Sequence, residues 1–348
     1  MPFPIQIPNP RVRIPVFCSH LAAFLSLIRH LVVWWLLLLL TVGVVNAQEY
    51  SYIHYDAKDG LAGTVVYSMC QDKEGFIWFG TETGVSRFDG THFKNFTVKD
   101  GLPDNTIIRV FADSKGRVWL VPFKHAICYY YKGKIYNQQN DPLLKEIKLD
   151  YFVATIWENK HQEILLKGDS SVYLITSNDQ VIPIASDTLK KAYIIGIGQS
   201  GNFFVLYRDH VYTYDKKHLT FYSRLKAGLG GPGHAILDDQ LLCSLESYGK
   251  VRIRSSLHKL DYVYDAPPLS NMYRLNDSIL CLNTTRGAIF LNILQRKAEN
   301  HFLPGKNISN MLTDREGGVW FSTFNDGVYR LSSKEFKNIK KKLMTGKS

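Results

Sequence analysis

The residue pattern that most suggests chemistry is GIGQSG at residues 196–201, which has the G-x-G-x-x-G spacing of a dinucleotide-binding loop. That loop requires a helix beginning at its last glycine, because the N-terminus of the helix holds the pyrophosphate. The residues that follow, NFFVLYRDHVYTY, are instead rich in the aromatic and β-branched side chains of strands. We therefore interpret Gly201 as the glycine of a turn between two strands, and we expect no cofactor.

Other side chains that could perform catalysis lack the necessary spacing. The sequence has no G-x-S-x-G, no H-E-x-x-H and no recognisable pair of catalytic carboxylates. Its histidines share no common repeat position. Four cysteines lie far apart within apolar runs and form no C-x-x-C pair: Cys70, Cys128, Cys243 and Cys281. We expect these cysteines to be buried free thiols, and we expect no metal site and no catalytic residues.

The chain is organised by an internal repeat of about forty residues. Trp78 and Trp119 are 41 residues apart, as are Asp72 and Asp113, and Trp320 follows Trp78 by 242 residues. That distance fits six steps of roughly forty residues. We place the intervening copies at Ile164, Phe204, Cys243 and Cys281. Seven repeats of this period predict an all-β fold, a seven-bladed β-propeller.

Three copies contain the same short pattern, an aspartate, a glycine three residues later and a tryptophan three residues after that. These structural repeat residues are Asp72, Gly75, Trp78, Asp113, Gly116, Trp119, Asp314, Gly317 and Trp320. The aspartate carboxylate is expected to bind backbone N–H groups of a turn, in which the glycine adopts a positive φ. A wide, flat indole at a fixed position suits the space between neighbouring blades.

The repeat also predicts how the ring closes. Residues 93–96 (FKNF) are the outer strand of the first blade, and residues 52–55 (YIHY) lie 41 residues earlier. Residues 336–339 (FKNI) occupy the same place after the last blade. Because YIHY is aromatic at alternate positions and carries little charge, we expect it to pair with the last blade near residues 328–331, leaving no open sheet edge. Residues 336–339 are then expected to be the looser segment.

The first 47 residues are typical of a cleaved secretory signal peptide. Their only charged residues are three arginines, residues 31–45 are continuously apolar, and Ala47 ends a small-residue cleavage site. We therefore expect a signal peptide at residues 1–47, a propeller at residues 48–339 and a basic tail at residues 340–348. The alternative is an uncleaved membrane anchor, although each apolar patch is shorter than the roughly 20 residues of a span.

The formal net charge of +11 is not evidence for nucleic-acid binding. It falls to +8 without the three arginines of the signal peptide, and residues 334–348 contribute +5 of that. The remaining body is close to neutral and has no clustered basic segment, as expected for a solvated surface. We expect nucleic acid not to be a partner.

With GLPDN at residues 101–105 followed by the Asp113, Gly116 and Trp119 pattern, the chain resembles the regulator-propeller repeat of bacterial sensor proteins. The resemblance covers residues 58–136 and 306–339 and is weak between them. It implies a periplasmic sensor domain that is followed, in such proteins, by a membrane helix and a histidine kinase. No membrane span, kinase histidine box or ATP-binding segment appears by residue 348. We therefore expect either a fragment of a longer sensor or a free-standing propeller.

Two classes of function remain open at this stage. The first is a periplasmic, non-catalytic propeller that binds a small molecule or glycan and acts with a membrane-anchored kinase or by self-association. The second is an exported propeller enzyme, of the lyase or glycosidase type, acting on a polysaccharide or peptide. In either case we expect ligand contacts on the face opposite the Asp-x-x-Gly turns, at Glu82, Asn105, Lys124, Lys167, Arg208, Asn325 and Asp326.

Overall fold

The computed structural model describes residues 50–151, 153, 155–225, 235–332 and 336, together with 28–30, 32, 34 and 35. Residues 1–49 and 50–348 form two separate units. The predicted signal peptide lies almost entirely outside the described residues, and the predicted basic tail lies wholly outside them. In the part of the chain that is described, we find no helix long and apolar enough to cross a bilayer.

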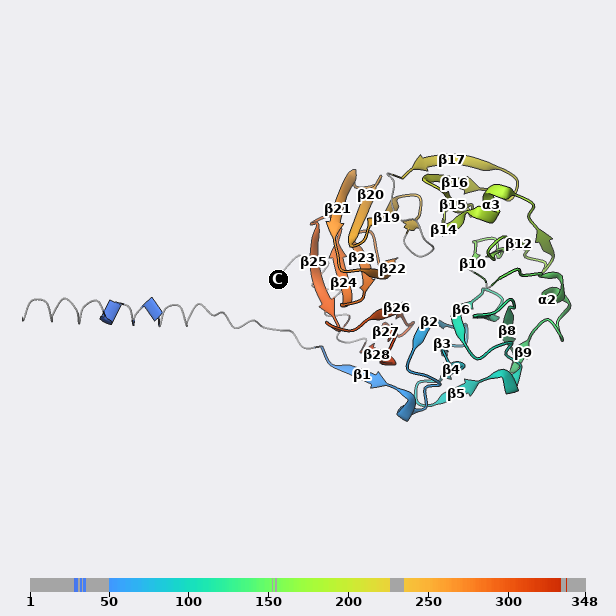
Figure 1. Ribbon diagram of the computed structural model, residues 1–348, viewed down its shortest axis with the longest axis horizontal. Coiled ribbons are helices and arrows are strands. Elements are labelled where there is room, and N and C mark those ends of the chain that lie inside the picture. Colours follow the sequence, from blue (N-terminus) through green and yellow to red (C-terminus); the bar gives the residue numbers. More distant parts are fainter. Residues whose placement is uncertain are drawn as a thin grey trace, which may run out of the picture. The chain divides into compact units, whose positions relative to one another are not determined.

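The second unit is a ring of seven antiparallel blades, each with four strands, around a central channel (Figure 1). The first strand of each blade lies beside the channel, and the fourth lies at the rim of the ring. The inner strands of blades four and five also share one parallel bridge, between Gly196 and Leu237. The seven-bladed β-propeller predicted from the repeat is confirmed.

The blades follow one another along the chain, and their strands have the following bounds. Blades one to three comprise β2 (Val66–Gln71), β3 (Ile77–Thr81), β4 (Val85–Phe88) and β5 (Phe93–Phe96); β6 (Ile107–Ala112), β7 (Val118–Pro122), β8 (Cys128–Tyr131) and β9 (Lys134–Tyr136); β10 (Thr155–Glu158), β11 (Ile164–Lys167), β12 (Val172–Ile175) and β13 (Val181–Pro183). Blades four and five comprise β14 (Tyr193–Ile197), β15 (Phe203–Tyr207), β16 (His210–Tyr214) and β17 (Leu219–Arg224); β18 (Ala235–Leu237), β19 (Leu241–Ser247), β20 (Lys250–Ser255) and β21 (Leu260–Asp265). Blades six and seven comprise β22 (Leu269–Arg274), β23 (Ile279–Thr284), β24 (Gly287–Asn292) and β25 (Lys297–Phe302); β26 (Ile308–Thr313), β27 (Val319–Thr323), β28 (Val328–Leu331) and β1 (Tyr52–Tyr55).

Short helices occupy some of the links between blades. Two 3₁₀ turns, η1 (Ala57–Asp59) and η2 (Val98–Asp100), precede the first two blades. The helix α2 (Pro142–Glu146) follows Asp141, whose side chain accepts a hydrogen bond from the Leu144 N–H. The helix α3 (Asp187–Lys191) was not predicted from the sequence; it links blades three and four and begins at a Ser186 cap.

Each repeated aspartate holds both the turn and the tryptophan that follows it. One carboxylate oxygen of Asp72 accepts a hydrogen bond from the Phe76 N–H at 2.9 Å, and the other accepts one from the Trp78 indole N–H at 2.6 Å. The same two contacts recur around Asp113 and around Asp314. Gly75 has φ = 102°, so the positive φ expected for this turn is present. The bond to the indole was missed in the sequence, although the constant spacing of six residues signals it.

The residues at the tryptophan position pack against the next blade around the ring. Trp78 lies in a buried cluster with Ile107 and Leu120 of blade two, and Trp320 lies in one with Val66 and Phe79 of blade one. Phe204, Cys243 and Cys281 make the equivalent contacts in blades four, five and six.

The placement of Ile164 at this position in blade three is wrong by one residue. Leu165 faces blade four, beside Phe203 and Val205, whereas Ile164 packs with Trp119 of blade two. Asn159 accepts hydrogen bonds from the turn of this blade, as Asp72 does in blade one, and the sixth residue after Asn159 is Leu165. Because side chains alternate along a strand, an error of one residue assigns the side chain to the opposite face.

The ring closes through the N-terminal strand, as the sequence predicts. The strand β1 pairs antiparallel with β28, and its register runs from Tyr52 opposite Leu331 to Tyr55 opposite Val328 (Figure 1). The Tyr55 ring stacks on Trp320 with centroids 5.9 Å apart and also contacts Phe88 of blade one at 5.2 Å. The strand therefore joins the last blade to the first through both its backbone and its aromatic side chains.

The expectation that residues 336–339 form a loose segment is wrong at Phe336. That side chain is 3% exposed and belongs to a buried cluster with Phe290 and Phe302 of blade six. The buried aromatic ring of Phe336 contributes to the core, although the backbone at this residue pairs with no described strand. Residues 337–339 lie outside the described residues.

Gly327 has no side chain, and this allows β1 to approach the last blade closely. The close approach leads to a stability prediction. Gly327 has φ = +63°, and a Cβ there would overlap the Tyr55 carbonyl oxygen. Gly327→Ala should lower the free energy of unfolding by about 2–5 kcal/mol, from roughly 1–2 kcal/mol of left-handed backbone strain and roughly 1–3 kcal/mol of overpacking. Urea denaturation followed by tryptophan fluorescence measures this loss.

The matched control is Gly305→Ala, because Gly305 has φ = +85° and nothing lies within 4 Å of an added Cβ. It should lose only the backbone contribution. Equal losses in both variants would show that the contact between Gly327 and Tyr55 does not constrain closure.

Candidate functional site

The seven residues expected to contact a ligand all lie in or beside loops at one end of the ring. Six of them are in or beside the loops that join the second and third strands of blades one, two, three, four and seven: Glu82, Lys124, Lys167, Arg208, Asn325 and Asp326. Asn105 lies in the link between blades one and two. Among the described residues, no hydrogen bond or ion pair joins any two of the seven. They share a face but do not form a cluster, and their role in binding stays a prediction.

Several of these side chains stabilise the loops themselves. The Glu82 carboxylate accepts hydrogen bonds from the N–H groups of Thr64 and Val65, both at 3.1 Å. The Asn105 side chain accepts one from the Val98 N–H at 2.9 Å. These bonds fix the links that enter blades one and two, so the two side chains have a structural task on this face.

The charged members of the set are also engaged within the loops. Lys124 donates to the Pro103 carbonyl at 3.4 Å, and the Arg208 guanidinium lies over the Tyr207 ring at 5.3 Å. Lys167 is buried and donates to the Gly168 carbonyl at 2.6 Å, and burial lowers the pKa of its amine. Asp326 forms an ion pair with Lys306, which contributes to a lowered pKa of the Asp326 carboxyl. Asn325 is exposed at the tip of its loop.

The central channel contains a concave site with a volume of about 890 Å³. It is lined by the inner strands of six blades, which surround the hole in Figure 1: β2, β6, β10, β14, β22 and β26. None of the seven candidates lines it. The volume lies within the range of about 300–1,000 Å³ that is usual for small-molecule sites, so the channel is the strongest candidate site in the described part of the chain.

Polar residues occupy one level of this channel. In each of these blades, one residue of the inner strand pairs with the residue that lies two positions after the tryptophan site of the second strand. In five blades this inner-strand residue is polar and lines the channel. These residues are Ser68, Arg109, Thr155, Asn271 and Asn310. In blade four the same register position is held by Tyr193, which is not among the lining residues. The level beside it is apolar, with Met69, Val110, Ile156, Met272 and Met311.

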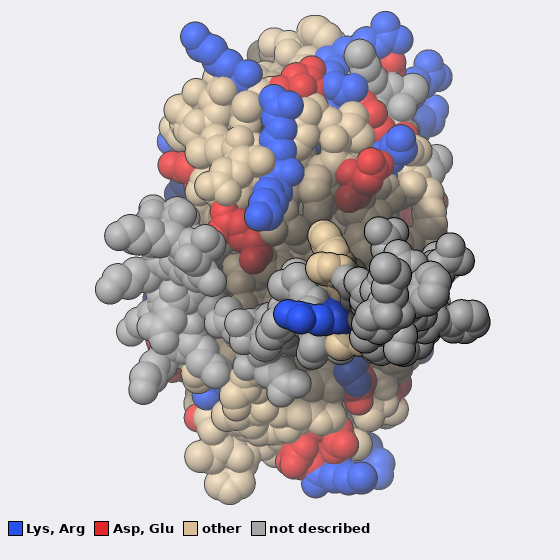
Figure 2. All heavy atoms as spheres, turned by 90° about the vertical axis from the view of Figure 1, so that its left-hand side faces the viewer, with Lys and Arg blue, Asp and Glu red and all other residues tan. Residues whose placement is uncertain are grey.

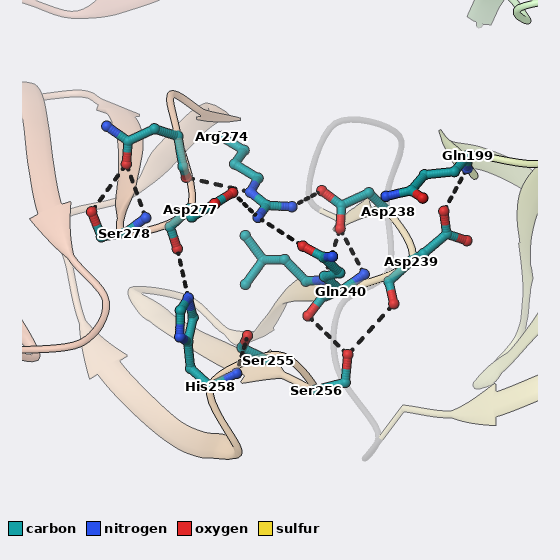
Figure 3. Close-up of polar contacts among 12 residues, drawn as sticks. Gln199, Asp238, Asp239, Gln240, Ser255, Ser256, His258, Arg274, Asp277 and Ser278 are labelled. Carbon is teal, nitrogen blue, oxygen red and sulfur yellow. Dashed lines mark hydrogen bonds and ion pairs between the residues drawn. The ribbon is translucent and has the colours of Figure 1, made fainter.

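The arginines that line the channel differ in their partners. Arg274 lies at the end of β22 between two carboxylates, those of Asp238 and Asp277, and Figure 3 shows both contacts. Arg315 donates to the backbone carbonyls of Lys73 and Asp72, both at 2.7 Å. Arg109 forms neither a hydrogen bond nor an ion pair with any described residue. Burial lowers the pKa of its guanidinium, which nevertheless remains charged at neutral pH.

The lining residues contain no group that titrates as a general acid or base near neutral pH. The described lining has neither histidine, aspartate nor glutamate. Its only thiol is Cys70, which is free, and burial raises the pKa of that thiol. Among the described residues, no cluster of three histidine, cysteine, aspartate or glutamate side chains could hold a metal ion.

The charged side chains of the outer surface are mixed in sign. On the face shown in Figure 2, lysine and arginine lie among aspartate and glutamate, and the coloured residues form no continuous basic surface. Several charged side chains of the ring are paired, for example Arg254 with Asp261 at 3.3 Å and Lys250 with Asp265 at 3.9 Å.

The fold and the channel define the chain as a seven-bladed β-propeller with a polar ring in its central channel. Within that class, residues 60–83 and 303–325 match the family described as the two component regulator propeller. The two matched segments lie in the first and last blades, and each contains the aspartate, glycine and tryptophan pattern. No curated protein matches the sequence as a whole.

Solved structures with the same fold come from several kinds of protein. The extracellular domain of a hybrid two component system from B. thetaiotaomicron is 16% identical with a TM-score of 0.63, over 82% of this chain and 42% of that one. Virginiamycin B lyase from Staphylococcus aureus is 12% identical with a TM-score of 0.61, over 81% and 98%. PorZ, a surface component of the type-IX secretion system of Porphyromonas gingivalis, is 12% identical with a TM-score of 0.56, over 81% and 38%. At these identities the likeness establishes the fold alone.

Proposed function

We propose that this propeller is an exported sensing or interaction domain of a two-component signal transduction system and that it does not itself catalyse a reaction. The observation that carries the proposal is the match of both ends of the ring to the two component regulator propeller. The extracellular domain of the B. thetaiotaomicron system, which shares the fold, supports a location outside the cytoplasm.

In this proposal the output comes from a membrane-anchored histidine kinase, in the same polypeptide or in a separate one. The ligand is a small molecule or a glycan, and self-association of the propeller is a second way to transmit the signal. The closed ring suits such a role, because blades joined by β1 form a rigid frame around the channel.

The competing function is that of an exported lyase or glycosidase. It draws support from the streptogramin and virginiamycin lyases, which share the fold. It requires an acid or base near the substrate, and the described channel lining has no imidazole or carboxylate to serve as one. The absence of these groups favours the sensing propeller over the enzyme.

A binding experiment separates the two functions. We expect protein purified from cells that express the whole gene to gain thermal stability from a compound in a mixture of small acids, sugars and glycan fragments. Mass spectrometry should recover that compound chemically unchanged after many hours, because a sensor releases what it binds. Heat-unfolded protein is the control, and conversion of the compound over many turnovers would overturn the proposal.

The link to a kinase is tested on the genome. We expect the reading frame that contains codon 348, or an adjacent gene in the same operon, to encode a histidine kinase. A neighbourhood that encodes only carbohydrate- or antibiotic-degrading enzymes would instead support the lyase or glycosidase function.

A further inference from the structure

We propose that the central channel binds a small organic acid through its carboxylate, which pairs with Arg109, while its apolar body lies against the aliphatic walls. This inference rests on the proposed function in that a sensing propeller binds a ligand. The chemical class of the ligand follows from the channel residues alone.

The charge on Arg109 has no counter-ion among the described residues. Arg109 lies in β6 at the polar level of the channel and is half-buried. By contrast, the charge of Arg274, which lines the same channel, is neutralised by two carboxylates of the chain itself. Buried charges in proteins are usually paired or bind a ligand. The bare guanidinium of Arg109 therefore points to an anion that comes from outside the chain.

A second feature is the arrangement across the channel from Arg109. Arg109 of β6 and Tyr273 of β22 line the same channel, although β6 belongs to blade two and β22 to blade six. The Tyr273 hydroxyl accepts a hydrogen bond from the Asn271 side-chain amide and donates one to Oδ1 of Asn310, both at 2.8 Å. These bonds hold the phenol in place, and the Asn310 amide nitrogen keeps its donors for another acceptor.

A third feature is the surplus of donors on the neighbouring wall. The Thr155 hydroxyl and the Trp157 indole N–H, both in β10, are buried and have no hydrogen-bond partner. The described lining contains no carboxylate. A wall that has two unsatisfied donors and no anionic side chain suits an oxyanion rather than a cation.

The chemistry of the oxyanion follows from the charge and the walls. The polar level of the channel holds one guanidinium, that of Arg109, which balances one negative charge. Its planar fork binds a carboxylate with two parallel hydrogen bonds. The walls beside it are apolar, with Ile108, Ile194, Ile195, Leu275 and Leu312. A phosphate dianion would leave one charge unbalanced, and a sugar acid would bury hydroxyls against these side chains without partners. An aliphatic or aromatic monocarboxylate satisfies both requirements.

Isothermal titration of the purified full-length gene product with 3-phenylpropionate tests this proposal. The uncharged 3-phenylpropanamide, glucuronate and inorganic phosphate are the comparison probes. We expect 3-phenylpropionate to bind more tightly than all three. Tighter binding of phosphate or the amide would show that the channel does not select a carboxylate. Tighter binding of glucuronate would show that the rest of the ligand is not apolar and would assign the channel to an acidic glycan. No heat with any probe at millimolar concentration would overturn the site.

Variants of Arg109 assign the binding to that residue. Arg109→Gln should weaken 3-phenylpropionate binding by about 10- to 100-fold, the effect of removing a charged hydrogen-bond partner, while Arg109→Lys should retain part of the affinity. Arg286→Gln is the matched control, because it removes the same charge from an exposed loop. Thermal melts confirm that the variants are folded. Unchanged affinity in folded Arg109→Gln would show that the anion binds elsewhere.

Discussion

Deleting residues 48–57 should prevent the chain from accumulating as soluble protein. The deletion removes β1, so the backbone of β28 from Val328 to Leu331 loses its partner strand and becomes an open sheet edge that promotes aggregation. It also removes Tyr50, Tyr52 and Tyr55, which pack against the clusters of blades six, seven and one. The free energy of unfolding of an ordinary domain is about 5–15 kcal/mol. The free energy lost with a whole strand and its aromatic contacts is comparable to that total.

The control for this deletion is removal of residues 337–348, which keeps the buried Phe336. We expect this protein to remain folded and monomeric by size-exclusion chromatography, with a melting curve close to that of the intact chain. Each deletion is expressed in the same cells with the same signal segment, and the soluble fraction is compared. A soluble, cooperative protein after loss of residues 48–57, or aggregation after loss of residues 337–348, would mean that the C-terminal segment closes the ring.

Most of the fold could be predicted from the sequence because a propeller repeats its local chemistry. The carboxylate of Asp72, the turn at Gly75 and the indole of Trp78 form one unit, and its recurrence at a fixed period indicates the number of blades. The prediction failed by one residue in blade three, where Gln162 adopts the positive φ of the turn in place of glycine. Without the glycine and the tryptophan, the position of the strand could not be fixed by counting.

The candidate site could not be predicted in the same way. The residue type at the polar level of the channel varies between blades, as Ser68, Arg109 and Thr155 show, so this level has no repeated pattern to detect. Which side chain lacks a partner is also a property of the assembled ring. Arg109 and Arg274 are both arginines of inner strands, and only the structure shows that Asp238 and Asp277 neutralise the second. The sequence instead drew attention to loop residues such as Glu82, whose contacts are within its own blade.

Replacing Trp320 should cause the largest loss of stability among single substitutions. Trp320 is 1% exposed, and its ring lies 5.7 Å from both Phe79 and Phe88 of the first blade. Trp320→Ala should therefore lower the free energy of unfolding by about 3–5 kcal/mol, as buried large-to-small changes do. Trp78→Ala and Trp119→Ala should cost a similar amount. Urea denaturation measures the loss, and values below about 1 kcal/mol for all three, typical of surface changes, would mean that the indoles do not fill the space between blades.

A double-mutant cycle separates the packing of the Trp320 ring from its hydrogen bond to Asp314. Asp314 is 4% exposed and accepts hydrogen bonds from the Trp320 indole at 2.9 Å and the Gly318 N–H at 2.6 Å. Trp320→Phe keeps an aromatic ring but removes the indole donor, and Asp314→Ala removes the acceptor. Since each change breaks the same bond, their costs should fall short of additivity by about 1–3 kcal/mol.

The comparison that isolates this bond is Trp157→Phe, because the buried Trp157 indole N–H has no partner. Combined with Asp314→Ala, it should give additive losses, since it shares no bond with the blade-seven turn. Strict additivity for the Trp320→Phe and Asp314→Ala pair would mean that the carboxylate serves the turn alone. The recurring six-residue spacing would then reflect strand geometry, and the aspartate would stabilise each blade without holding the tryptophan in place.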